Sequence, residues 1–140
     1  MHKHILFAIT LTIILSCGQN EPLNKYEPKS IQEQALKSVL LNFEEGVSNK
    51  DFKKIGNLFH DKASLMVGRD RKIISKEEYI KILPKRLDDN PYMALGTPKM
   101  TISGDKAEIK IYMTRGDNRY PFIFNMKMEN NRWYILGWEY

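Results

Sequence analysis

The sequence predicts an α+β domain in which three helices gather on one face of a mainly antiparallel sheet. Two periodicities carry this prediction. Between residues 31 and 87 the apolar residues recur mostly at helical spacing, and from Tyr92 to the last residue they alternate with a period of two. Helices followed by a run of strands are typical of α+β domains, whose helices cover one face of the sheet.

The first helix is expected from Ile31 to about Val47, because Ser30-Ile31-Gln32-Glu33 is a capping box and apolar residues follow at helical spacing. Its predicted inward stripe consists of Ile31, Ala35, Val39, Leu40, Phe43 and Val47. After the break SNKD, a shorter stripe predicts a second helix that ends at FHD. That stripe consists of Phe52, Ile55, Leu58 and Phe59.

A short strand, ASLMV, follows the second helix, and GRD turns the chain back into KII. A second capping box, Ser75-Lys76-Glu77-Glu78, opens a third helix. Its predicted inward residues are Tyr79, Ile80, Leu83 and Leu87. Pro84 is expected to kink or shorten this helix, because proline lacks the amide hydrogen that an internal turn needs.

Four alternating segments predict an antiparallel meander: KMTIS, KAEIKIYMT, YPFIFNMKME and RWYILGWEY, separated by GD, RGDNR and NN. Alternation places two sets of side chains on the inner face, Ala107, Ile109, Ile111 and Met113 on one strand, and Phe122, Phe124, Met126 and Met128 on the next. On the last strand, Trp133, Ile135 and Gly137 share a face with Glu139. Glu139 is therefore expected either inside the domain or at its solvent rim.

The N-terminus predicts export. A basic start and the 11-residue apolar run from Ile5 to Leu15 are typical of a signal peptide, and the run is about half of the roughly 20 residues that a membrane-spanning helix needs. Cys17 is the only cysteine, and Ile14-Leu15-Ser16-Cys17 resembles the bacterial lipoprotein box. The resemblance implies acyl chains on Cys17 that anchor the chain to a membrane of the bacterial cell envelope, at the outer membrane or the periplasmic face. An ordinary secreted protein cut near Ser16 is the alternative.

These features divide the chain into a signal peptide (1–16), a lipidated Cys17 with a flexible tether (17–29) and one domain (30–140). Removal of residues 1–16 leaves His60 as the sole histidine, which argues against histidine-based metal sites and triads. The formal net charge of +5 comes from basic residues interspersed with acidic ones, as at Arg69-Asp70-Arg71. This pattern favours a solvated surface over nucleic-acid binding.

Four sequence segments resemble, in the correct order, the nuclear-transport-factor-two-like superfamily, also called the SnoaL-like or cystatin-like cone fold: SNKDFKKIGNLFHDKASLMV, GRDRKIISKEEYI, GDKAEIKI and NNRWYIL. The resemblance covers residues 30–140. It implies a strongly curved sheet that forms a cone, with a pocket between the first helix, the first strand and the concave sheet face. This superfamily includes enzymes, binding modules and oligomerisation domains, so the fold does not fix the function.

The ketosteroid isomerases of this superfamily place a tyrosine acid on the first helix and an aspartate base on the first strand. A gap-free match from residue 43 to residue 67 puts Phe43 and Val67 at these two positions, and neither side chain transfers a proton. The expected site is therefore an apolar pocket that binds a small molecule or a protein partner without turnover and without a cofactor or metal. Its expected lining is Phe43, Val67, Ile111, Met113, Phe124 and Met126.

The alternative is a lyase, isomerase or cyclase that uses Glu139 and the pocket residue Tyr79. His60, beside Asp61, is a weaker acid–base candidate because the resemblance puts both on a rim loop. The resemblance also suggests a homodimer through an apolar patch on the outer face of the sheet. That patch consists of Tyr112, Ile123, Tyr134 and Trp138.

Overall fold

The computed structural model describes residues 21–89 and 92–140, so the predicted signal peptide and Cys17 lie outside the described residues. It confirms the predicted order of helices and strands. The helices are α1 (Ile31–Ser48), α2 (Phe52–Leu58) and α3 (Lys76–Asp89). The strands are β1 (Phe59–Val67), β2 (Lys72–Ser75), β3 (Ala94–Leu95), β4 (Lys99–Ser103), β5 (Lys106–Arg115), β6 (Asn118–Glu129) and β7 (Arg132–Glu139).

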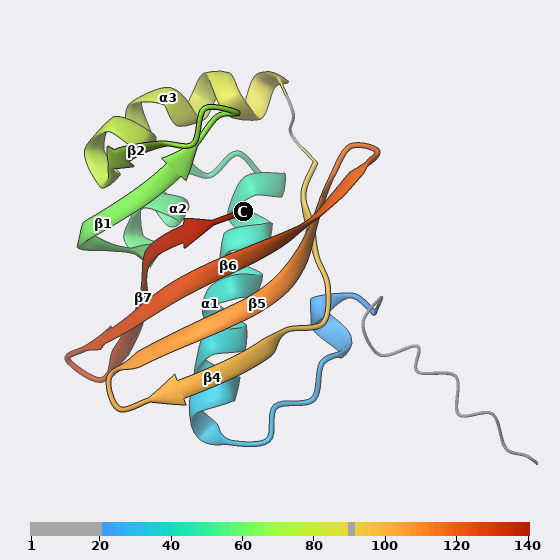
Figure 1. The fold of residues 1–140 in the computed structure, drawn as a ribbon, viewed down its shortest axis with the longest axis vertical. Coiled ribbons are helices and arrows are strands. Elements are labelled where there is room, and N and C mark those ends of the chain that lie inside the picture. The colour runs from blue at the N-terminus through green and yellow to red at the C-terminus, as the bar shows by residue number, and fades with distance from the viewer. Residues whose placement is uncertain (1–20, 90–91) are drawn as a thin grey trace, which may run out of the picture.

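The strands form one curved sheet with the order β2-β1-β7-β6-β5-β3, and β4 pairs with β5 beside β3. All pairs are antiparallel except β1 with β7. The predicted meander is thus β4 to β7, and Asn130 and Asn131 turn the last hairpin with positive φ values of 51° and 59°. Figure 1 shows α1 lying along one face of this sheet and α3 beside β1 and β2. None of the helices in residues 21–89 and 92–140 is long and apolar enough to cross a membrane.

The inward face of α1 differs in part from the prediction. Ser30 caps the helix as expected, because its hydroxyl accepts a hydrogen bond from the Glu33 amide at 3.1 Å. The buried stripe is Leu36, Leu40, Phe43, Gly46 and Val47. Ile31 and Ala35 are exposed, because the neighbouring stripe that contains Leu36 offers the larger apolar area to the sheet.

The second capping box forms in full. The amide of Glu78 donates to the Ser75 hydroxyl at 3.2 Å, and the amide of Ser75 donates to the Glu78 carboxylate at 3.1 Å. Tyr79, Leu83 and Leu87 are buried as predicted, and the helix continues past Pro84 to Asp89 rather than ending there. The buried face of α3 therefore extends along the helix from Tyr79 to Leu87.

His60 lies within β1 rather than on the predicted rim loop, because the strand begins at Phe59 directly after α2. Its Nε2 atom contacts the Glu129 carboxylate, and its ring packs edge-on against Tyr134 with centroids 6.0 Å apart. The side chain is thus engaged with β6 and β7 at the outside of the fold.

A β-bulge in β7 reverses the predicted orientation of the last residues. Asn125 pairs with Gly137 but Met126 pairs with Ile135, so Leu136 is an extra residue opposite β6. Trp133 and Ile135 face inward as predicted, whereas beyond the bulge Trp138 is buried and Glu139 is exposed. Of the two positions expected for Glu139, the structure has the solvent rim, because strict alternation does not survive the bulge.

Residues 21–29, predicted to belong to a flexible tether, are packed on the domain where the structure describes them. Leu23, in a 3-10 turn from Leu23 to Lys25, is only 1% exposed. The Lys37 ammonium donates hydrogen bonds to the backbone carbonyls of Asn24 and Tyr26 at 3.1 and 2.6 Å. The Thr97 hydroxyl donates a hydrogen bond to the backbone carbonyl of Glu21 at 3.1 Å. The packed domain consequently begins before residue 30.

Candidate ligand-binding pocket

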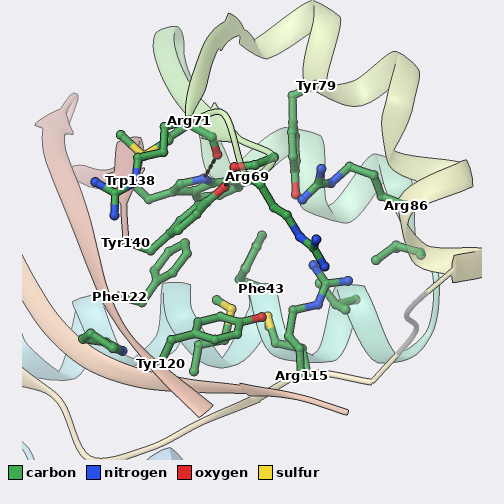
Figure 2. A pocket seen from close by; sticks show the side chains of 17 residues that line it. Phe43, Arg69, Arg71, Tyr79, Arg86, Arg115, Tyr120, Phe122, Trp138 and Tyr140 are labelled. Carbon is green, nitrogen blue, oxygen red and sulfur yellow. Dashed lines mark hydrogen bonds between the residues drawn. The ribbon is translucent and has the colours of Figure 1, made fainter. Parts of the chain in front are cut away.

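A cavity of about 690 Å³ opens between α1, α3, the β1–β2 turn and the ends of β5, β6 and β7. Its lining comprises Phe43, Val47, Met66, Gly68, Arg69, Arg71, Tyr79, Arg86, Leu87, Met93, Met113, Arg115, Tyr120, Pro121, Phe122, Trp138 and Tyr140. Figure 2 shows aromatic side chains on one side and arginine side chains around them. The cavity thus has an apolar part and a cationic part.

Trp138 forms the centre of the apolar part. Its indole lies 5.1 Å from the Tyr79 ring, 5.7 Å from Phe43 and 5.7 Å from Phe122, measured between centroids. Its Nε1–H donates to the carbonyl of Met66 at 2.7 Å, which satisfies the one polar atom of the indole. The bulge in β7 therefore places a large apolar surface in the cavity where strict alternation would have placed a carboxylate.

Tyr140 fixes the turn that carries two of the arginines. Its ring stacks on Phe122 with centroids 5.8 Å apart, and its hydroxyl donates to the carbonyl of Gly68 at 2.7 Å. Gly68 has a φ of +76°, a conformation that glycine adopts without strain. The β1–β2 turn, including Arg69 and Arg71, is thereby held against the end of β7.

The four arginines of the lining come from three separate elements. Arg69 and Arg71 lie in the β1–β2 turn, Arg86 in the last turns of α3, and Arg115 at the end of β5. Figure 2 shows Arg69, Arg86 and Arg115 extending toward the same part of the cavity, whereas Arg71 points elsewhere. Among the described residues that line the cavity there is no Asp, Glu, His or Cys. The cavity is consequently cationic.

Arg86 and Arg115 lie deeper than the two arginines of the turn. Both are half-buried, whereas Arg69 and Arg71 are exposed. The Nε atom of Arg86 is buried and has no hydrogen-bond partner within the described residues. A buried polar atom without a partner is costly, so a group that supplies an acceptor at this position would be stabilised there.

Tyr79 places a neutral hydroxyl beside these arginines. Burial raises its pKa to about 12, and the nearby Arg86 and Arg115 act in the opposite direction. Burial also raises the pKa of Tyr140, with Arg86 and Arg71 opposing the rise. Both phenols are therefore protonated near neutral pH and serve as hydrogen-bond donors or acceptors.

No family model matches the sequence, and no curated protein matches it. Solved structures do match. An NTF2-like protein from Cytophaga hutchinsonii superposes with a TM-score of 0.69 at 13% identity, over 78% of this chain and 96% of that one. A cystatin-like fold protein from Nostoc punctiforme gives 0.69 at 16% identity, over 81% and 92%. An NTF2-like protein from Shewanella baltica gives 0.64 at 18% identity, over 81% and 97%.

The chain has the NTF2-like fold. The helix order, the curved sheet and the pocket at its end all agree with the cone that the sequence resemblance implies. At identities of 13–18% the likeness shows the fold alone. The ligand chemistry of this NTF2-like pocket therefore depends on its own residues.

The NTF2-like pocket contains two of the six predicted lining residues, Phe43 and Met113. The other four, Val67, Ile111, Phe124 and Met126, are buried in the core instead. Phe124 illustrates the reason, since α1 covers the inner sheet face and brings the Phe43 ring to 5.8 Å from the Phe124 ring. The cavity is left only toward the end of the cone, beyond the residues that α1 covers.

The three candidate acid–base residues are not brought together. Tyr79 lines the pocket, Glu139 is exposed and pairs with Ile123 across the β6–β7 ladder, and His60 contacts Glu129 outside the pocket. The described residues also contain no group of three or more His, Cys, Asp or Glu side chains arranged to hold a metal ion. Trp138 leaves the predicted outer dimer patch, and dimerisation through Tyr112, Ile123 and Tyr134 stays a prediction.

The sequence prediction missed the arginines, although two signals were present. Arg86 follows Tyr79 by seven residues and Leu83 by three, which puts it on the inner face of α3. Arg115 continues the inward alternation that includes Ile111 and Met113. From the sequence, Arg86 is expected on a solvated surface because basic and acidic residues alternate around it, and Arg115 is expected in the hairpin turn RGDNR.

Proposed function

We propose that this NTF2-like domain binds a small molecule with an apolar body in its cone and does not convert it. The supporting observation is the cavity of about 690 Å³ lined by Phe43, Met113, Phe122 and Trp138. This volume lies in the range of about 300–1,000 Å³ that is usual for small-molecule sites. The polar groups of the lining would orient the ligand, and the apolar wall would supply most of the binding free energy.

The lining supports binding rather than catalysis. An acid–base enzyme needs a group whose pKa lies near the working pH, and arginine and a tyrosine with a pKa of about 12 do not meet that requirement. Phe43 and Met66, which line the wall, offer no proton to transfer. The alternative enzyme built on Glu139 loses its support, since that carboxylate is exposed on the other side of the strand.

We further propose that the domain works at the bacterial cell envelope, anchored through acyl chains on Cys17. The support is the lipoprotein-box resemblance after the apolar run from Ile5 to Leu15. Replacement of Cys17 by Ala should release the protein from membranes, and the wild type should carry acyl mass on its N-terminal peptide. Membrane retention of the variant together with a wild type free of acyl mass would contradict the anchor.

Binding can be tested on residues 17–140 with Cys17→Ser, since every described element lies within that range. The probe is N-phenyl-1-naphthylamine, an apolar dye whose fluorescence rises in apolar surroundings. We expect saturable 1:1 binding, which Met93→Trp should abolish because an indole would occupy the cavity. Tyr92→Trp is the matched control, since Tyr92 is 57% exposed next to Met93.

The control variant should bind the dye as the wild type does. Absence of saturable binding to the wild type would contradict the proposed function. Unchanged binding in Met93→Trp, with cooperative unfolding preserved, would place the dye outside the cone and would contradict it as well.

A further inference from the structure

The cationic side of the pocket remains unexplained by an apolar ligand. Four arginines line one cavity, three of them extending toward the same part of it (Figure 2), and Asp70, the acidic residue of the β1–β2 turn, is exposed between Arg69 and Arg71. Asp88, on the last turn of α3, pairs with Lys50 at 2.9 Å on the outside of the domain. No acidic side chain is among the described residues that line the pocket.

Arginine is suited to one class of group in particular. Its planar guanidinium donates paired hydrogen bonds to the two oxygens of a carboxylate, sulfonate or phosphate. Here such a group would be reached from three elements, since Arg69, Arg86 and Arg115 extend toward the same region in Figure 2. The low polarity of the neighbouring wall strengthens each of these charge–charge contacts relative to water.

Two further features mark the position of the anion. The buried Nε–H of Arg86 has no acceptor within the described residues, and the neutral Tyr79 hydroxyl lies beside that guanidinium (Figure 2). An oxyanion placed here would accept hydrogen bonds from the Arg86 Nε–H and from the Tyr79 hydroxyl. Val47, Met93 and Met113 line the same cavity and would accommodate an uncharged body.

Building on the proposed function, we propose that the ligand is a free organic acid with an apolar body, whose anionic group is bound by Arg86 and Arg115 with Arg69 and the Tyr79 hydroxyl completing the contact. Charge and hydrophobicity are then recognised at adjoining parts of one cavity. The proposal excludes apolar cations and makes neutral apolar molecules weaker ligands than their acidic counterparts.

The test compares two dyes that share the anilinonaphthalene skeleton. 1-Anilinonaphthalene-8-sulfonate carries an anion, and N-phenyl-1-naphthylamine does not. Arg86→Gln should weaken binding of the sulfonate about tenfold or more, because it removes a charge-assisted hydrogen bond, and should change binding of the neutral dye less than about twofold. Arg115→Gln, on a different element, should act in the same direction.

Lys85→Gln is the matched control, because it removes the same charge from the exposed neighbour of Arg86 on α3. It should leave the affinity for both dyes unchanged. If Arg86→Gln and Arg115→Gln, both unfolding cooperatively, bind the sulfonate as the wild type does, the anion proposal is wrong while the proposed function stands. If neither dye binds the wild type, the proposed function itself fails.

A third arm separates a free acid from a membrane lipid headgroup. Phosphatidylglycerol vesicles should not raise the melting temperature of the wild type more than that of Arg86→Gln, because a lipid held in a bilayer cannot place its headgroup and its apolar chain in the same cavity. A selective rise in the wild type would assign the arginines to lipid headgroups and would overturn the free-acid proposal.

Discussion

Tyr79 joins the core and the pocket within a single side chain. Its ring packs edge-on against Phe59 and Trp138, with centroids 5.5 and 5.1 Å away, while burial raises the pKa of its hydroxyl to about 12. The unfolded chain ionises near the ordinary value of 10.0, so the folded state retains this proton over a range in which the unfolded state has lost it. The folded domain must therefore lose stability as the pH rises from 10 to 12.

We predict that Tyr79→Phe reduces this alkaline loss of stability by about 2 kcal/mol, the value expected for a shift of that size in a buried group. The measurement is the free energy of unfolding in urea at several pH values from about 9 to about 12. Burial, with the Glu33 carboxylate, also raises the pKa of Tyr26 to about 12, so only the difference between variant and wild type is informative.

The matched control is Tyr92→Phe, at a residue that is 57% exposed. It should keep the same dependence of stability on pH as the wild type. An identical alkaline loss in Tyr79→Phe and the wild type would show that the Tyr79 hydroxyl is solvated rather than buried.

At the scale of elements, the last strand shows where sequence reasoning stops. Alternation correctly predicted β5, β6 and the inward orientation of Trp133 and Ile135. A two-residue period carries no information about an inserted residue, so it could not locate the bulge at Leu136 that turns Trp138 inward and Glu139 outward. The bulge arises next to Gly137, where β1 approaches β7 in parallel.

We predict that Gly137→Ala destabilises the domain by about 2 kcal/mol or more, because a β-carbon at this position would lie 2.5 Å from the backbone oxygen of Ser64. Gly56→Ala is the control. Its β-carbon would lie 3.1 Å from the flexible end of the Ile80 side chain, and alanine favours the helix, so its stability should equal or exceed that of the wild type. Chemical denaturation of both variants measures the difference, and equal stabilities would contradict the close approach of β1 to β7.

The N-terminal turn supports a second prediction at this scale. Leu23→Ala should cost about 2–4 kcal/mol, since the side chain is 1% exposed within the core. Ile31→Ala, at a residue that is 90% exposed, should change stability by less than about 0.5 kcal/mol. The sequence predicted the reverse, with Ile31 buried and Leu23 in a flexible tether. Thermal unfolding of both variants measures the two losses of stability, and a Leu23→Ala variant as stable as the wild type would support the flexible tether.

At the scale of the molecule, the fold was predictable and the pocket only in part. Capping boxes, helical stripes and the meander are local patterns, and each agreed with the α+β cone. The pocket depends on which inward residues α1 leaves uncovered. Met113 lines the pocket, whereas Ile111, on the same face of the same strand, is buried in the core. Charged residues such as Arg86 are expected on the solvated surface, because burial of an unpaired charge is unfavourable. The sequence alone does not show the ligand that could pair with such a charge.

We predict that the affinity for 1-anilinonaphthalene-8-sulfonate changes less than about twofold between pH ~5.5 and ~8.5. The described residues that line the pocket include no Asp, Glu, His or Cys, and both arginine and Tyr79 keep their protonation states across this range. The sulfonate also stays ionised. Fluorescence titration at several pH values across this range measures the affinity. A steep change in affinity would reveal a titrating group at the site and contradict the prediction.

If Cys17 carries the acyl chains that we propose, the packed N-terminal turn also limits how far the domain can move from a membrane. Only three residues, 18 to 20, separate Glu21, whose carbonyl accepts the Thr97 hydrogen bond, from Cys17. Even fully extended, the four steps of chain from Cys17 to Glu21 span at most about 14 Å. With the acyl chains that we propose on Cys17, this short connection keeps the domain close to the lipid headgroups. The distance is comparable to the screening length of about 8–10 Å over which anionic headgroups attract the net positive charge of the protein. The cone would then meet its ligands at the lipid surface rather than in the open aqueous space beyond it.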